Sequence, residues 1–137
     1  MPIEITYRDD GGVLLKGRGI LSGEDISKTN LVLYETPEKI KALTYQLCDY
    51  SEIERLDMAT VWVRRLADED KRAADVNPGM LIAVVGKTEL TYGLLRMWQV
   101  YAEPSALKTA VFRNVSDALD WIREALAVKQ AHPSPKP

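Results

Sequence analysis

The sequence is poor in the residue types that build disulfides, zinc sites and nucleophile–base pairs. Its 137 residues include one cysteine, Cys48, and one histidine, His132. A lone cysteine cannot close a disulfide within the chain, and a zinc site needs about four nitrogen or sulfur ligands. His132 lies in a proline-rich end, away from any nucleophile in the folded part. We therefore expect a buried structural thiol at Cys48, no bound metal or cofactor, and no enzymatic activity.

Long apolar runs and an excess of one charge are also missing. The longest apolar run, residues 80–85, has six residues, whereas a membrane-spanning helix needs roughly 20. The chain has 18 basic and 20 acidic residues, so its net charge of -2 predicts no surface for nucleic acid or anionic lipid. No basic segment followed by an apolar region opens the sequence, as a secretory signal would. We expect a cytoplasmic protein without a membrane span and without a nucleic-acid partner.

The residues that are present suit one globular domain. Apolar residues make up 46% of the chain and charged residues 28%, which is ordinary usage for a single compact core. Neither a repeat nor an internal linker divides the sequence. Three prolines occupy the last five positions, where they remove backbone donors and leave few apolar groups to pack. We predict a domain over residues 1–127 and a disordered proline-rich tail over residues 128–137.

Alternating and continuous apolar patterns predict five strands. Residues 3–8 and 13–18 alternate between apolar and polar side chains, and the Asp-Asp-Gly-Gly turn between them predicts an N-terminal hairpin. Further strands are predicted at 42–48, 80–85 and 107–112. The run at 80–85 is apolar throughout, which is typical of a strand buried on both faces.

Four helices are predicted after the hairpin, one following each of the second to fifth strands. Ser22, Asp57, Thr88 and Ser116 are placed to act as their N-caps, and Pro37 is expected to end the first helix. The order is therefore strand, strand, helix, strand, helix, strand, helix, strand, helix. Such alternation predicts an α/β fold with a five-stranded, mostly parallel sheet and right-handed crossovers.

Polar side chains occupy one side of the first three predicted strands. They are Glu4, Thr6, Lys16, Arg18, Thr44 and Gln46. Strands covered by helices on both faces would instead be apolar throughout. We therefore expect the helices to lie mainly on one face of the sheet and the other face to be open and polar.

Two glycine-containing segments fall short of nucleotide-binding motifs. Residues 17–22 approach the dinucleotide fingerprint G-x-G-x-x-G, but a serine stands where the third glycine is needed. Gly86, Lys87 and Thr88 resemble the end of a phosphate-binding P-loop whose first glycine is replaced by Leu81. Two interpretations of residues 86–88 stay open: a site for a single anion at a helix N-terminus, or a helix cap beside a solvated lysine.

The segment between the third and fourth strands is rich in carboxylates. They are Asp49, Glu52, Glu54 and Asp57. Carboxylates suit a hard cation, but a solvated loop with a helix cap accounts for the same pattern, and we favour the solvated loop. No metal site is predicted here.

The predicted helix over residues 88–102 has more apolar residues than one buried stripe requires. They are Leu90, Tyr92, Leu94, Leu95, Met97, Trp98, Val100 and Tyr101. A helix apolar around most of its circumference is either deeply buried or part of an interface. One prediction is self-association into a homodimer through Met97, Trp98 and Tyr101; a ligand groove and ordinary burial are the alternatives.

Residues 47–60 resemble the central segment of anti-sigma factor antagonist (STAS) domains, in which a strand ends in Asp-Leu-Ser-Gly-Val and a helix opens with Asp-Ser-Ser-Gly. Asp49, Ser51, Ile53 and Asp57 match at the same spacing. The order of elements is also similar over nearly all of residues 3–127, particularly to the small SpoIIAA-like bacterial proteins. The resemblance implies a sheet flanked by helices, no catalysis, and a regulatory, protein-binding module in the bacterial cytoplasm.

The resemblance also implies a binding loop, formed here by Asp49, Ser51, Asp57, Ala59 and Thr60. Partner-switching members of the family are phosphorylated on the second serine of Asp-Ser-Ser-Gly. Ala59 occupies that place, so the usual phosphorylation switch cannot operate here. An alternative function is that of a carrier for a small apolar or lipid-like ligand, because a lipid-exchange domain family resembles the same single-layer winding.

Overall fold

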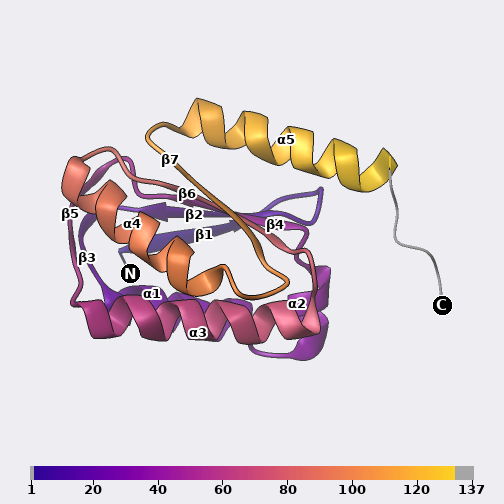
Figure 1. The fold of residues 1–137 in the computed structure, drawn as a ribbon, viewed down its shortest axis with the longest axis horizontal. Coiled ribbons are helices and arrows are strands. Elements are labelled where there is room, and N and C mark those ends of the chain that lie inside the picture. The colour runs from indigo at the N-terminus through magenta and orange to yellow at the C-terminus, as the bar shows by residue number, and fades with distance from the viewer. Residues whose placement is uncertain (1, 132–137) are drawn as a thin grey trace.

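A five-stranded sheet forms the centre of the computed structural model, which describes residues 2–131 (Figure 1). The strands of this sheet are β1 (Ile3–Tyr7), β2 (Val13–Gly17), β4 (Tyr45–Asp49), β6 (Leu81–Val85) and β7 (Lys108–Phe112). They lie in the order β1-β2-β4-β6-β7; β1 and β2 form an antiparallel hairpin, and all other pairs are parallel. The predicted α/β class and mostly parallel sheet are confirmed. The continuous apolar strand β6 is buried at every position.

Each parallel strand of this sheet lies beside the sheet strand before it in the chain, always towards the same edge of the sheet. The helices are α1 (Gly23–Leu33), α2 (Pro37–Ala42), α3 (Thr60–Val76), α4 (Glu89–Ala102) and α5 (Val115–Ala131). The long crossover helices α1, α3 and α4 pack on the same face and share its hydrophobic core. The strand order never reverses, so the sheet lacks the switch-point crevice in which doubly wound folds bind nucleotides.

The opposite face of the sheet is half covered, which corrects the expectation of a fully open polar face. Helix α5 lies across β4, β6 and β7 on this side, where Ala118 and Ile122 close a second apolar core (Figure 1). The part formed by β1 keeps exposed polar side chains, Glu4 and Thr6. Gln46 was expected on the open face but is buried towards the crossover helices, because Tyr34 accepts a hydrogen bond from its amide.

A second, two-stranded sheet was not predicted from the sequence. Strands β3 (Gly19–Ser22) and β5 (Ile53–Asp57) pair in parallel at one end of the molecule (Figure 1). Residues 49–60 therefore do not form a single loop, and Asp57 ends a strand instead of capping a helix. The N-cap of α3 is Ala59, which makes no side-chain hydrogen bond to the helix.

Several predicted helix boundaries shift by a few residues. Ser22 and Thr88 cap α1 and α4 as predicted. Pro37 does not end α1 but opens the short helix α2, at a position where its missing N–H costs no hydrogen bond. The N-cap of α5 is Asn114 rather than Ser116, because Asn114 Oδ1 accepts the Asp117 N–H at 2.9 Å.

Helix α5 also continues to Ala131, four residues beyond the predicted end of the domain. Residues 132–137 of the predicted tail, His132 among them, lie outside the described residues. Across residues 2–131, no helix combines the length and the apolar character needed to cross a bilayer.

Candidate functional site

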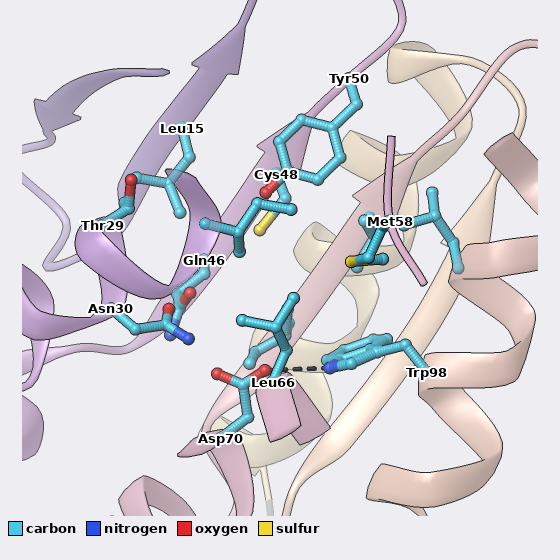
Figure 2. A pocket seen from close by; sticks show the side chains of 14 residues that line it. Leu15, Thr29, Asn30, Gln46, Cys48, Tyr50, Met58, Leu66, Asp70 and Trp98 are labelled. Atoms are coloured by element: carbon cyan, nitrogen blue, oxygen red, sulfur yellow. Dashed lines mark hydrogen bonds between the residues drawn. The ribbon is translucent and has the colours of Figure 1, made fainter. Parts of the chain in front are cut away.

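A small cavity lies between the sheet and the helices α1, α3 and α4 (Figure 2). Its volume of about 40 Å³ would hold roughly three or four water molecules. Fourteen side chains line it, most of them aliphatic or aromatic. Interiors of proteins are close-packed with few voids larger than one water, so a buried, mainly apolar space of this size is a candidate site for a very small ligand.

The floor of the cavity follows directly from the strand pairing. Leu15 of β2, Cys48 of β4 and Val84 of β6 are register partners and form one row across the sheet. Gln46 and Ile82 belong to the next row. Since side chains alternate between the two faces of a strand, all five point to the face covered by the crossover helices.

Asp70 of α3 is the charged group in the cavity wall, and it is only 6% exposed. Its Oδ1 accepts the Tyr34 hydroxyl at 2.8 Å. Its Oδ2 accepts the indole N–H of Trp98 at 3.0 Å (Figure 2). Tyr34 in turn accepts the Gln46 amide at 2.6 Å. This one carboxyl group thereby joins α3 to α4, to the end of α1 and to β4.

The electrostatic environment of Asp70 opposes ionisation. Burial raises the pKa of Asp70 to about 7, against the opposing effect of the hydrogen bonds from Tyr34 and Trp98. Glu69 on the same helix raises it further. Among the ion pairs of the described residues, none includes Asp70. The carboxyl is therefore stabilised by neutral donors alone.

The thiol and phenol groups nearest the cavity are held in their neutral forms. Burial raises the pKa of Cys48 to about 12 and that of Tyr50 well above its ordinary value. The prediction of a buried thiol at Cys48 is confirmed. Since the thiolate is the nucleophilic form of cysteine, the wall presents hydrogen-bonding groups rather than an activated nucleophile.

Two side chains connect the cavity with the surface. Of the lining residues, Ile26 of α1 and Met58 are half-buried and all the others are buried. Met58 lies in the short connection between β5 and α3. We define these two residues as the mouth of the cavity.

The five residues of the predicted binding loop are divided between two places. Asp49 is buried, and its Oδ1 accepts both the backbone N–H of Ser51 at 3.0 Å and its hydroxyl at 2.6 Å. Burial opposes ionisation of Asp49, but these bonds and Lys16 outweigh it and lower the pKa of the carboxyl. Asp49 and Ser51 therefore satisfy each other in a turn.

The other three residues of the predicted binding loop, Asp57, Ala59 and Thr60, are exposed around the start of α3. The neighbours Tyr50 and Met58, which sequence reasoning did not single out, are the ones that reach the cavity.

The carboxylates of the same segment do not assemble into a metal site. Lys16 forms ion pairs with both Asp49 and Glu52. Within the part of the chain that the structure describes, no three histidine, cysteine or carboxylate residues are grouped to hold a metal ion.

Residues 86–88 form a helix cap. The Gly86 N–H donates to the carbonyl of Phe112 at 2.9 Å, and Thr88 Oγ1 accepts the Thr91 N–H at 3.2 Å. Two of the three groups expected to bind an anion are therefore used within the chain, while Lys87 is exposed. The geometry favours the cap with a solvated lysine over the anion site.

The apolar excess on α4 is largely explained by burial. Trp98, expected at the centre of an interface, is 6% exposed and hydrogen-bonded to Asp70, so the structure places it in the core instead. Met97 and Tyr101 are half-buried and pack against the same core. Leu90 and Val100 remain at the surface, at 69% and 62% exposure.

The position of Asp70 carries a signal that the sequence analysis did not use. The buried residues of α3 are Val63, Leu66, Ala67, Asp70, Ala73 and Ala74. This spacing is the i, i+3, i+4, i+7 pattern of one helix face, and Asp70 interrupts it with a carboxylate. A charged residue on an otherwise apolar stripe indicates a buried charge with specific partners.

No family model matches the chain, and no curated protein or solved structure does so either.

Proposed function

We propose that this chain is a non-catalytic binding module that holds a small ligand in the cavity beneath α1, α3 and α4. The observation that carries the proposal is a space of about 40 Å³ whose apolar lining contains one buried carboxyl group. Ligand sites typically combine a mainly apolar wall with a few fixed polar groups that orient the ligand. Asp70, held by Tyr34 and Trp98, is such a group.

The chemistry of the lining supports binding rather than catalysis. The Cys48 thiol and the Tyr50 hydroxyl have raised pKa values, so neither is an activated nucleophile at neutral pH. Asp70 accepts two hydrogen bonds from groups that hold it in place.

Native mass spectrometry of freshly purified protein tests this proposal, together with chromatographic analysis of compounds released by denaturation. We expect a retained small molecule in the wild-type protein. Val84→Ile adds one methylene to the cavity wall and is expected to lower the retained amount. Val61→Ile makes the same change at a side chain that is 71% exposed, and it serves as the control. A bare wild-type chain that no small probe stabilises would contradict the proposal.

A second candidate function is favoured by the start of α3. Ala59 leaves the first backbone N–H groups of this helix without a side-chain cap, and Thr60 and Val61 beside it are exposed. These residues belong to or directly follow the segment that resembles STAS domains. We propose on this basis that the surface around Ala59 binds a protein partner in a bacterial, cytoplasmic regulatory role.

Affinity capture from native bacterial lysate tests the protein-binding role. Val61→Glu places a charge on the proposed surface and is expected to abolish capture of a specific partner. Val128→Glu makes the same change on the exposed side of α5 and should leave capture unchanged. Sedimentation of the purified variants shows whether the captured partner is a second copy of this chain. Equal capture by all three proteins would refute a role for this surface.

A further inference from the structure

We infer that the ligand of the cavity is a small organic cation, an alkylammonium ion of about three or four non-hydrogen atoms, whose charge pairs with Asp70. This inference rests on the proposed binding function and names the chemical class of the ligand. Three features of the structure support it: the direction of the hydrogen bonds, the charges around the cavity, and the shape and composition of its wall.

The hydrogen bonds around Asp70 fit a carboxylate better than a neutral acid. The Trp98 indole can only donate, and it donates to one carboxylate oxygen. Tyr34 accepts a hydrogen bond from the Gln46 amide, and its hydroxyl donates a hydrogen bond to the other carboxylate oxygen. A proton on Asp70 would occupy one of these oxygens and weaken at least one of the two hydrogen bonds, because a neutral acid is a poorer acceptor than a carboxylate. The network is therefore arranged for a buried negative charge.

No positive charge within the described residues balances that carboxylate. Glu69, the residue before Asp70 on α3, accepts hydrogen bonds from Ser27 and Asn30 of α1. Its own charge is paired with Arg65 at 3.7 Å, and it raises the pKa of Asp70. The remaining titratable groups around Asp70 are Tyr34, Cys48 and Tyr50, and burial keeps all three neutral. A buried ion is strongly destabilising unless it is paired, and a cationic ligand would supply that pairing when Asp70 is ionised.

The wall of the cavity suits the two parts of an alkylammonium ion. Trp98 and Tyr50 line it, and aromatic faces attract cations. In Figure 2, Asp70 and Trp98 lie at one end of the ring of side chains, and Tyr50 and Cys48 lie at the other. Leu15, Leu66 and other aliphatic side chains surround the space between them and would contact a short alkyl group. The volume limits the part of a ligand held inside to about three or four non-hydrogen atoms.

Titration with n-propylammonium, followed by the indole N–H signal of Trp98 in a ¹H–¹⁵N correlation spectrum, tests the inference. Trp98→Phe assigns that signal among the three tryptophans. At pH 8 we expect n-propylammonium to shift the signal and to bind at least tenfold more tightly than 1-propanol, which has nearly the same size and no charge. Sodium propionate, the anionic counterpart, should not bind.

The pH dependence and one variant separate charge pairing from apolar burial. Affinity for n-propylammonium should rise by up to tenfold per pH unit as Asp70 ionises between pH 5 and pH 7, whereas affinity for 1-propanol should not. Asp70→Asn keeps the shape of the side chain and should remove the preference for the cation. The comparison of the two probes on wild-type protein needs no variant, so it holds even if Asp70→Asn fails to fold.

Equal binding of n-propylammonium and 1-propanol would overturn the charge assignment while supporting the proposed binding function. Absence of any shift with either probe would overturn the inference, because the cavity would then hold water alone. If no retained compound were found as well, the binding function would also be refuted.

Discussion

Asp70 is the residue that most clearly departs from the pattern of its surroundings. It occupies a position on α3 where the residues before and after it along the same face are apolar. Helical periodicity alone therefore predicts that position 70 is buried, although a carboxylate is rarely buried without a partner. The partners Tyr34 and Trp98 are 36 and 28 positions away along the chain, and local patterns give no information about them.

We expect the stability of the protein to fall as the pH rises from 5 to 8. The pKa of Asp70 is about 7 in the folded state against an ordinary value of 3.8, so the folded state holds a proton that the unfolded state has released. This difference costs roughly 4 kcal/mol between pH 4 and pH 7 and stays constant above that range. Denaturant unfolding at several pH values measures it.

Asp70→Asn is the matched variant for this measurement, since it removes the titration and retains the shape. Its stability should change little between pH 5 and pH 8. Asp49 does not interfere, because its pKa is lowered and its contribution is lost only as the pH falls below the ordinary value of 3.8. A wild-type profile as flat as that of the variant would show that Asp70 is ionised throughout this range.

Cys48 should be inert towards thiol reagents in the folded protein at pH 8. Burial raises its pKa to about 12, so the thiolate is scarce and the sulfur is shielded. Labelling with a chromogenic disulfide should be complete in denaturant and at least a hundredfold slower without it. Cys48→Ser provides the blank, because the chain has no other cysteine. Rapid labelling of the folded protein would mean that the cavity opens to the reagent.

The ends of the helices depend on competition among neighbouring polar residues. Ser22 and Thr88 cap their helices as the sequence predicts. Asp57 is a residue type that often caps helices, but the pairing of β5 with β3 places it in a strand. Ser116 was displaced by Asn114, which lies at the last position before the helix begins. Residue type thus predicts the neighbourhood of a cap more reliably than its exact position.

Asn114→Ala should destabilise the protein by about 1 kcal/mol through loss of the α5 cap. Ser116→Ala, two residues further on, is the matched control and should change the free energy of unfolding by less than about 0.5 kcal/mol. Thermal or urea unfolding of both variants measures the difference. A larger effect at Ser116 would move the start of α5 back to the boundary that the sequence suggested.

At the scale of the whole molecule, the order of the main strands and helices was predicted correctly, but how the elements pair and cover the faces of the sheet was not. The five central strands and the four long helices follow from periodicity and turn residues, because each signal is local. The pairing of β3 with β5 is not local: Gly19 is the register partner of Ile53, and several side chains of both strands are exposed. Such short strands have no alternating pattern to recognise.

The expectation about the second face of the sheet was wrong for a related reason. Gln46 reads as a solvent-facing residue, yet it is buried because Tyr34 satisfies its amide. In a sequence, a polar residue with a buried partner looks the same as a polar residue in water.

The candidate site was also only partly predicted. The segment over residues 49–60 was identified, but Tyr50 and Met58 of this segment line the cavity, and its acidic residues do not.

Covering of the second face by α5 should be essential to stability. Ile122 is 4% exposed and packs with Leu47 and Leu81. Ile122→Ala is expected to cost about 2–5 kcal/mol, since it leaves a void in the smaller core. Arg123→Ala, the exposed neighbour, should be within about 0.5 kcal/mol of the wild type. If the two variants unfolded at the same urea concentration, α5 would not be docked on the sheet in solution.

Met58 belongs at once to the mouth of the cavity and to the backbone that leads into Ala59. A ligand that enters the proposed site past Met58 is expected to displace this side chain. The peptide bond after Met58 leads directly into Ala59, the uncapped start of α3. We therefore expect a ligand bound in the proposed site to change the surface around Ala59, which is the surface proposed to bind a protein partner. Such a coupling would need no phosphorylated residue.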